Sequence, residues 1–380
     1  MPIIASSMPS FGEEEVRAVA EALRSGHVGG DGPIGRRLQC DMEERFGIKH
    51  VLLTPSATHA LDLAICALGI GPDDEVILPS FTFVSIANAV MRTGARPVFA
   101  EISDSTLDLD PARLEEVITA RTRTIIPAHY AGVGAPMEAY LEIASRYGLD
   151  VFEDAAQGVG AKRNGRWLGT FGDIGGFSFH ETKNLTCGEG GAFLTDRDDI
   201  FKKAEILYEK GTNRSQFMRG EVQKYTWVGQ GGSYVLPDLL AAVLRVQLSR
   251  MDELHGKRRH VFMRYEEGLR DLERKERLRL PVIPGNCEPN WHIFYLRLPS
   301  PEERARVLTE MRARGVMCSF HFVPLHSSPF GTAQLGYREG DFPVTERVSS
   351  TLLRLPLHAG ITDAQADRVL ESMWEVLREA

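Results

Sequence analysis

The chain has 380 residues, of which 43% are hydrophobic and 25% charged, and its formal net charge is −8. This composition is typical of a folded globular protein, and the length allows two or three domains. The acidic balance argues against binding to the phosphate backbone of nucleic acid, which requires a basic patch.

Short apolar runs alternate with helical patterns from about residue 50 to residue 195. Helical spacing of apolar residues is clearest over 57–68 and 137–147. This alternation predicts an α/β domain with a large, mainly parallel sheet, in which ligands bind at the carboxyl ends of the strands. Strands are expected at Val51–Leu53, Glu75–Leu78, Arg96–Phe99, Thr124–Pro127, Leu149–Phe152, Phe177–Phe179 and Ala192–Leu194.

The pattern changes after about residue 235, where Leu236–Arg270 is predicted to be helical throughout. A second alternation of strands and helices then predicts a smaller α+β domain. We expect residues 1–249 to form the large domain and residues 250–380 the small one. The expected elements of the small domain are strands near Trp291–Leu298 and Val316–Phe320, and helices over Pro301–Arg314 and Asp363–Glu379.

Three of the predicted strands are followed by residues that suit a bound cofactor. Ser56 and Thr58 open a helix after the first strand, where they either hold a phosphate or only cap the helix. Phe81 and Phe83 follow the second strand and either stack on a flat ring or pack in the core. Asp154 follows a later strand and either pairs with a pyridine nitrogen or caps a helix.

Lys183 follows another apolar strand and precedes the glycine-rich turn Gly188–Gly191. Only nine of the 44 basic residues are lysines. Lysines normally lie on the surface, so one at the end of a buried strand suggests a chemical role. A partly buried lysine amine can form a Schiff base with pyridoxal phosphate. Because a phosphate site, an aromatic residue, a carboxylate and this lysine follow successive strands of one sheet, the sequence predicts a pyridoxal-phosphate site.

Several longer stretches carry a resemblance that covers nearly the whole chain: Gly26–Gly35, Thr54–Thr58, Pro79–Asn88, His129–Gly132, Glu153–Gln157, Ser178–Asn184, Gly188–Gly191 and Pro324–His326. In these stretches the chain resembles the DegT/DnrJ/EryC1/StrS sugar aminotransferases, a family of fold-type-I pyridoxal-phosphate enzymes. Phe179–Asn184, Glu209–Phe217 and Lys224–Trp227 are most similar to the members that make dTDP-4-amino-4,6-dideoxygalactose. The resemblance implies the aspartate-aminotransferase-like fold.

The resemblance also implies roles around the cofactor ring. Lys183 would form the Schiff base and later move the proton between cofactor and sugar carbon. Asp154 would pair with the pyridine nitrogen and Gln157 would contact the ring hydroxyl. Phe83 would stack on the ring face.

At the other end of the cofactor, the resemblance implies that Ala57, Thr58 and Ser178 hold the phosphate. In this family the active site lies between the two subunits of a homodimer, and the partner usually supplies an asparagine to the phosphate. Ser233 occupies that position here. A serine hydroxyl can still donate one hydrogen bond.

The implied reaction moves the amine of L-glutamate to C4 of dTDP-4-keto-6-deoxy-D-glucose, giving 2-oxoglutarate and an amino sugar of galacto or gluco configuration. Transamination at another carbon or on another nucleotide sugar is the alternative, and a non-catalytic pyridoxal-phosphate-binding regulator is a third. His180, Arg214 and His326 are candidate substrate contacts, with structural or solvated roles as their alternatives.

The first residues lack a basic stretch followed by an apolar run, so we expect no secretory leader. No segment approaches the roughly 20 apolar residues of a membrane helix. The five cysteines are scattered, without paired metal-ligand spacing. We therefore expect a cytoplasmic protein with reduced thiols, no metal and no membrane contact.

Overall fold

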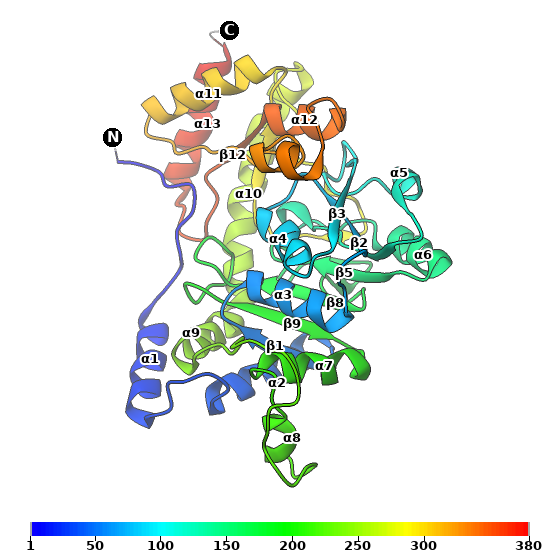
Figure 1. The fold of residues 1–380 in the computed structure, drawn as a ribbon. Helices are drawn as coiled ribbons and strands as arrows, with labels where there is room; N and C mark the ends of the chain where they lie inside the picture. The colour runs from blue at the N-terminus through cyan, green and yellow to red at the C-terminus, as the bar shows by residue number, and fades with distance from the viewer. Residues whose placement is uncertain (1, 379–380) are drawn as a thin grey trace.

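The computed structural model describes residues 2–378 and is built around a seven-stranded sheet (Figure 1). The strand order is β1-β9-β8-β5-β4-β2-β3, and only β9 runs antiparallel to its neighbours. The prediction of a mainly parallel α/β sheet is therefore confirmed. The strands are β1 His50–Thr54, β2 Glu75–Pro79, β3 Arg96–Ala100, β4 Thr122–Ile125, β5 Asp150–Asp154, β8 Ile174–Ser178 and β9 Gly191–Thr195.

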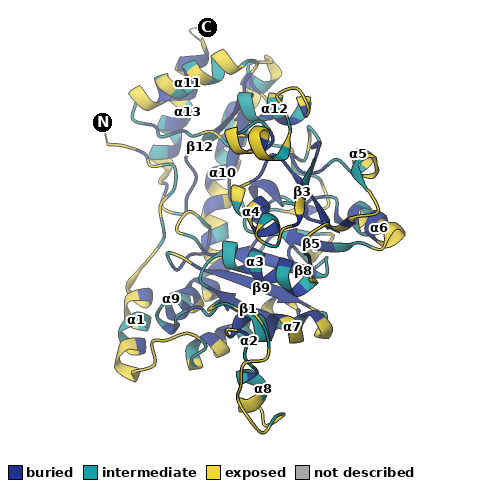
Figure 2. Ribbon diagram, in the orientation of Figure 1, coloured by how far each residue is buried: buried dark blue, intermediate teal, exposed yellow. Residues whose placement is uncertain are grey.

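Helices cover both faces of this sheet, which explains why its strands are apolar along their whole length. In β1, Leu52 points to the core under α3, α4 and α7, whereas Val51 and Leu53 point to the core under α2 and α9. Figure 2 shows the sheet as a buried layer between these helices. Their bounds are α2 Pro33–Phe46, α3 Ala57–Leu68, α4 Val84–Arg92, α7 Asp198–Tyr208 and α9 Asp238–Ser249; α6 Met137–Tyr147 covers β4 and β5.

A second core lies above the sheet in Figure 1, around a two-stranded antiparallel pair. This pair is β11 Phe294–Arg297 and β12 Leu352–Leu355, and helices α10 Met251–Arg274, α11 Pro301–Ala313 and α13 Asp363–Arg378 pack around it. Ile4 belongs to this core, because the amino-terminal segment runs up to it from α1 Glu13–Ser25 and bridges Val316. The first residues thus pack with the part of the chain expected to form the small domain, not with the rest of residues 1–249.

Helix α10 contacts both cores. Met251 and Leu254 pack under the large sheet, whereas Val261 and the turns after it pack in the second core. The continuous helix expected over Leu236–Arg270 is instead two helices that meet at Arg250, whose guanidinium binds Glu15 at 2.8 Å.

Other differences from the predicted elements are local. The expected strand Val316–Phe320 forms only single bridges, from Val316 to Ile4 and from Ser319 to Arg354. The pattern did not anticipate β12 or helix α12 Pro343–Thr351, because both lie in a proline-punctuated stretch. Glu379, the expected end of the last helix, lies outside the described residues. Further short elements include α5 Pro111–Leu114, α8 Arg214–Met218, β6 Lys162–Arg163, β7 Arg166–Trp167 and β10 Cys287–Glu288.

Within residues 2–378, no helix has both the length and the apolar character needed to cross a membrane. All five cysteines are free thiols.

A buried carboxylate fixes the turn that leads into β8. Glu153 accepts hydrogen bonds from His129 Nε2 and from the backbone N–H groups of Gly169, Phe171 and Gly172. Its side chain is fully buried, so these donors replace all of its hydration. Because side chains alternate along a strand, Glu153 points away from the side on which Asp154 lies.

We expect Glu153→Gln to lower the free energy of unfolding by about 3 kcal/mol, since the amide would turn an N–H group toward donors that need an acceptor. Chemical denaturation measures this loss. The matched control is Glu116→Gln, on an exposed surface, which should change stability by less than about 0.5 kcal/mol. A Glu153→Gln protein as stable as this control would contradict the claim that the hydrogen bonds accepted by Glu153 stabilise the fold.

Candidate active site

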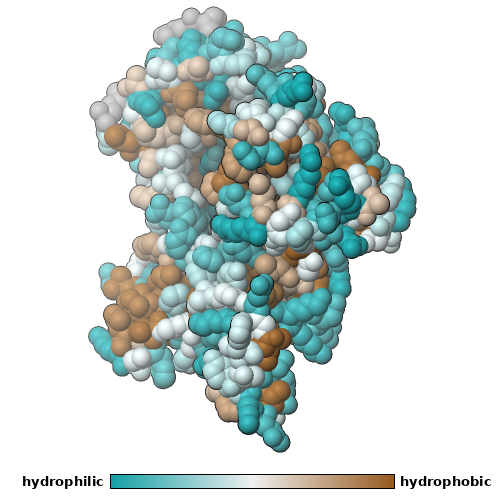
Figure 3. Space-filling model, in the orientation of Figure 1, coloured by the Kyte–Doolittle hydropathy of each residue, from teal (hydrophilic) through white to brown (hydrophobic). Residues whose placement is uncertain are grey.

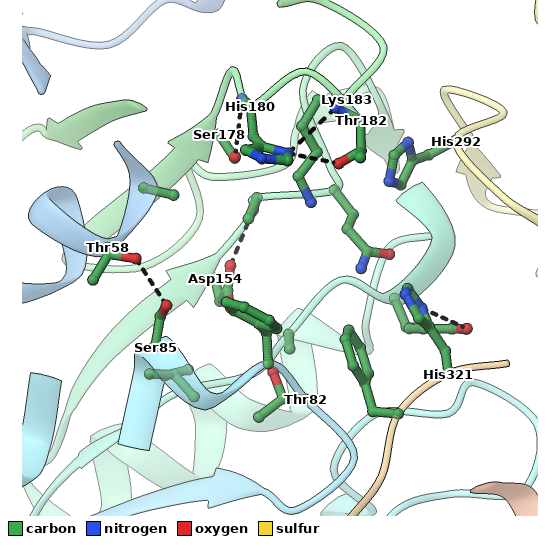
Figure 4. Close-up of a pocket in the computed structure, with 18 of the residues that line it drawn as sticks. Thr58, Thr82, Ser85, Asp154, Ser178, His180, Thr182, Lys183, His292 and His321 are labelled. Carbon is green, nitrogen blue, oxygen red and sulfur yellow. Dashed lines mark hydrogen bonds between the residues drawn. The ribbon is translucent and has the colours of Figure 1, made fainter. Parts of the chain in front are cut away.

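A cavity of about 740 Å³ opens at the carboxyl ends of the parallel strands, between the large sheet and the second core. Its size is in the usual range for a site that takes a small molecule. Figure 4 shows Lys183 reaching into the middle of this cavity. Thr58 and Ser85 lie on one side of the lysine, and His292 and His321 lie on the opposite side.

The loop that carries Lys183 is hydrogen-bonded both to the large sheet and to the segment that leads into β11. On the sheet side, Thr186 Oγ1 donates to the carbonyl of Phe179 at 3.0 Å. On the other side, Asn184 donates to the Asn290 carbonyl at 2.6 Å and its Oδ1 lies 2.8 Å from His292 Nδ1. The backbone of Lys183 is therefore fixed between the two cores, while its side chain is free to reach into the cavity.

The Lys183 amine is placed to lose its proton easily. Burial lowers its pKa to about 8, and Arg354 adds to this effect while the carboxylate of Asp154 opposes it. Within residues 2–378 no carboxylate forms a salt bridge with Lys183. An amine with a depressed pKa and no ion-pair partner is suited to attack a carbonyl or to act as a base.

Asp154 lies at the end of β5 and also lines the cavity. Its Oδ1 accepts a hydrogen bond from the Ala156 N–H at 3.0 Å, and burial raises its pKa. Its Oδ2 has no hydrogen-bond partner among the described residues, so one oxygen remains for a ligand atom. A ligand that places a protonated ring nitrogen there would supply the missing positive charge.

Gln157 and Phe83, the other residues predicted around the ring, line the same cavity. Gln157 Oε1 accepts from the Ala131 N–H at 2.7 Å, which leaves the amide N–H₂ group as a donor. Phe83 is 60% exposed, which is unusual for a phenylalanine packed only as core and which leaves its ring face available to a planar ligand.

The amino terminus of α3 forms the end of the cavity where the sequence predicts a phosphate. Ser56 caps the helix by accepting from the His59 N–H at 3.3 Å, whereas the N–H groups of Ala57 and Thr58 have no partner within the helix. Such N–H groups and the positive end of the helix favour a bound anion. Thr58 Oγ1 also lies 2.8 Å from Ser85 Oγ.

The start of β9 packs tightly against this helix end. A Cβ on Gly191 would come within 2.5 Å of the Ser56 carbonyl carbon, so only glycine allows the strand to pass there. Ser178, the last residue of the neighbouring strand β8, is buried and completes this end of the cavity. The structure therefore brings together seven of the eight residues predicted for the cofactor: Lys183, Asp154, Gln157, Phe83, Ala57, Thr58 and Ser178.

Ser233, the eighth, is not among the residues that line this cavity. It is exposed and bridges Glu209 at the base of the segment that carries α8. Its expected contact with the phosphate of a partner subunit stays a prediction.

The three candidate substrate contacts separate in the structure. His180 lines the cavity, with Nδ1 2.9 Å from Thr182 Oγ1 and Nε2 3.6 Å from Glu189. Arg214 lies outside it, 2.9 Å from Glu209 and 3.3 Å from Asp31.

His326 is fully buried outside the cavity lining, with Nδ1 2.7 Å from Ser80 Oγ and Nε2 2.9 Å from Glu346. Both ring nitrogens are thus occupied by the protein itself. The geometry favours the structural alternative for this histidine.

Three further cavity residues were not singled out by sequence reasoning: Tyr130, His321 and Arg354. Arg354 Nη1 lies 2.5 Å from His321 Nε2, and His321 Nδ1 lies 3.4 Å from the Tyr130 hydroxyl. One signal was present, because Arg354 is a lone charge among the leucines of β12. Its neighbour His321 has no such signal, since it lies in an irregular stretch.

A family model described as the DegT/DnrJ/EryC1/StrS aminotransferase family matches residues 9–374. The spore coat polysaccharide biosynthesis protein SpsC of Bacillus subtilis is 34% identical over 98% of this chain and 97% of its own length.

Among solved structures, DesV of S. venezuelae has a TM-score of 0.89 and 33% identity, covering 99% of this chain and all of its own. The pyridoxal-phosphate form of the putative sugar aminotransferase Spr1654 of Streptococcus pneumoniae has a TM-score of 0.91 and 25% identity, with coverage of 99% for both chains. These matches confirm the predicted fold type I.

Proposed function

This chain belongs to the DegT/DnrJ/EryC1/StrS aminotransferase family, and we propose that it transfers the amine of L-glutamate to C4 of dTDP-4-keto-6-deoxy-D-glucose. The coarser activity, sugar transamination, follows from the family. The observation that carries the proposal is that Lys183 and Asp154 share one cavity with the phosphate site of α3.

Pyridoxal phosphate is the cofactor, and the residues of the cavity suit it at three separate points. Among the described residues, the amine of Lys183 is unpaired by any carboxylate and Asp154 has one oxygen without a partner. The first turn of α3 presents N–H groups that have no acceptor within the helix. When bound, the cofactor supplies a carbonyl for the lysine amine and a ring that accepts the electron pair of the breaking C–H bond.

The residues of this chain would then act as follows. Lys183 Nζ takes the proton from the carbon that bears the amine of the donor, and later delivers a proton to C4 of the sugar. Asp154 keeps the ring nitrogen protonated through its free Oδ2. Ala57, Thr58 and Ser178 hold the phosphate, Gln157 donates to the ring hydroxyl and Phe83 covers one ring face.

The stretches Phe179–Asn184, Glu209–Phe217 and Lys224–Trp227 support the choice of a dTDP-linked 4-keto sugar, with the galacto product preferred over the gluco product. Transamination at another carbon, or of another nucleotide sugar, is the second candidate. A regulator without turnover is disfavoured, because the amine of Lys183 keeps a pKa of about 8 inside the site.

We also propose a homodimer whose active sites lie at the interface. The segment around α8 projects from the bottom of the molecule in Figure 1 and carries large exposed apolar side chains, among them Trp227 at 77% and Met218 at 71% exposure. Such a patch is expected to be covered by a partner. In that dimer Ser233 would reach the phosphate of the neighbouring site, and Arg214 would lie near its entrance.

Incubation of the purified holoenzyme with dTDP-4-keto-6-deoxy-D-glucose and L-glutamate tests the proposed reaction, with NMR reading the carbon aminated and its configuration. We expect 2-oxoglutarate and an amine at C4. Matched reactions with a 3-keto isomer and with UDP-linked sugars identify the second candidate. A holoenzyme that aminates none of these sugars would contradict the proposal.

The depressed pKa of Lys183 predicts how fast the apoenzyme captures pyridoxal phosphate at different pH. Only the neutral amine attacks the carbonyl, so the rate should rise with pH and be half-maximal near pH 8, because burial lowers the pKa of Lys183 to about 8. An exposed lysine would still be gaining rate above about pH 10. Stopped-flow absorbance measures the rate. A half-maximal rate at the pH expected for an exposed lysine would contradict the claim that burial lowers the pKa of Lys183.

A further inference from the structure

Arg354 has no acidic partner, although it lies inside the protein and beside the reacting lysine. It follows Leu353 on β12, lines the active-site cavity and interacts electrostatically with Lys183. Within residues 2–378 no carboxylate lies within salt-bridge distance of its guanidinium. A cation that is only partly exposed and has no counter-ion is costly, so the site suits an anion that comes from outside the chain.

The hydrogen bonds of Arg354 leave two donors free. Nη1 donates to His321 Nε2 at 2.5 Å, which places the proton of His321 on Nδ1, facing the Tyr130 hydroxyl at 3.4 Å. Nε is fully buried and has no hydrogen-bond partner, and Nη2 makes no hydrogen bond in the described part of the chain. Nε and Nη2 together form the edge of the guanidinium that binds a carboxylate through two parallel hydrogen bonds.

The surrounding charges point the same way. Arg258 lies close enough to interact with Arg354. Its partners within residues 2–378 are the carbonyls of Trp291, His292 and Leu357, so among these residues it adds a second cation without a carboxylate. Burial lowers the pKa of His321 to about 2, so its ring stays neutral and its Nε2 remains an acceptor for the Arg354 guanidinium. In the described part of the chain, Asp154 is the one carboxylate that acts on the pKa of Lys183.

The position of Arg354 separates it from the cofactor phosphate. The phosphate site at Thr58 and Ser85 lies on one side of the cavity in Figure 4, whereas His321, to which Arg354 is bonded, lies on the opposite side. Lys183 lies between the two. An anion bound at Arg354 would therefore lie across the cavity from the phosphate site, on the far side of Lys183.

We propose that Arg354, oriented by His321 and Tyr130, is a carboxylate-binding subsite that positions the molecule whose amine is exchanged at Lys183. This inference rests on the proposed aminotransferase function. Two substrates can bring a carboxylate to this subsite: the amino-acid donor, through the carboxylate next to its amine, or a keto-sugar of the uronic-acid type.

The test measures each half of the reaction separately, in wild-type holoenzyme and in Arg354→Gln. In the donor half, the protein is mixed with L-glutamate alone and the absorbance of the bound cofactor is followed. We expect Arg354→Gln to raise the glutamate concentration for half-maximal rate at least about 30-fold, the effect of removing one partner of a desolvated charge pair. Arg347→Gln is the control, since Arg347 is exposed on α12 and pairs with Asp104.

In the sugar half, the amine-loaded protein is mixed with either dTDP-4-keto-6-deoxyglucose or a nucleotide-linked keto-uronic acid. A loss confined to glutamate assigns the subsite to the donor, and a loss confined to the uronic acid assigns it to the sugar. Binding of glutarate to the unreacted holoenzyme by calorimetry provides a readout without turnover and should weaken in parallel with the glutamate effect.

The inference is overturned if Arg354→Gln stays within about threefold of wild type in the glutamate, uronic-acid and glutarate measurements. If Arg354→Gln proves unstable, Arg354→Lys replaces it in the test. Lysine keeps the charge but cannot form two parallel hydrogen bonds, so carboxylate binding should weaken about tenfold. Thermal melts and cofactor content verify folding of each variant. If wild type reacts with glutamate but with no sugar, the proposed function fails while the subsite stands.

Discussion

Lys183→Ala should lose at least about 10³-fold in turnover while still binding pyridoxal phosphate. Removing the amine eliminates both the covalent link to the cofactor and the base that moves the proton. The cofactor should remain, because Asp154, Ser178 and the first turn of α3 do not depend on the lysine. Measuring 2-oxoglutarate formation and cofactor content of the same preparation gives both quantities.

Lys257→Ala is the matched control, since this lysine is exposed on α10 and pairs with Glu253 on the same helix. Its turnover should equal that of wild type. A Lys183→Ala protein that keeps more than about a tenth of the activity would show that another group moves the proton. Loss of folding is excluded by an unchanged thermal midpoint.

Asp154→Asn should lower turnover about 10²- to 10³-fold with the fold intact. The asparagine carbonyl can still accept from the Ala156 N–H, which Asp154 Oδ1 now accepts at 3.0 Å. The substitution removes the negative charge that keeps the ring nitrogen protonated. The same charge raises the pKa of Lys183, against the lowering that burial causes.

The same substitution should also lower the pKa of Lys183 further, since Asp154 is the group that raises it. Capture of pyridoxal phosphate by Asp154→Asn should therefore reach half its maximal rate at a lower pH than in wild type. Asp271→Asn, an exposed position on α10, serves as the control. A capture profile that coincides with wild type would contradict the coupling of the two charges.

The sequence was sufficient to predict the large sheet because its strands are buried on both faces and its helices keep a regular apolar spacing. Seven expected strands correspond to the seven of the sheet, with β4, β5 and β8 displaced by one to three residues. The antiparallel direction of β9 has no local signal. It arises because the chain turns back at Gly188–Gly191, where Gly191 passes directly beside Ser56.

Lys183 and Asp154 were also predictable, because Asp154 ends one strand of the sheet and Lys183 follows its parallel neighbour, and topology alone brings such residues together. Arg354 and His321 were not, since they come from a strand of four residues and an irregular stretch of the second core. Their meeting depends on how that core packs over the sheet. For the same reason the sequence does not show that Ser80 and Glu346 engage both nitrogens of His326, a candidate substrate contact.

The surface viewed in Figure 3 carries a brown apolar area where α1 lies in Figure 1. Val16 and Leu23 of this helix are 61% and 58% exposed. This face and the α8 segment are the two parts of the molecule that the proposed homodimer would be expected to cover. Light scattering of the purified protein gives the oligomeric state directly.

Borohydride reduction of the purified holoenzyme, followed by peptide mass spectrometry, tests the central claim most directly. The reagent makes the link between lysine and cofactor permanent, so the labelled peptide reports which of the nine lysines is used. We predict one phosphopyridoxyl group per chain, on Lys183. A label on any other lysine, or no label on protein that binds pyridoxal phosphate, would contradict the account.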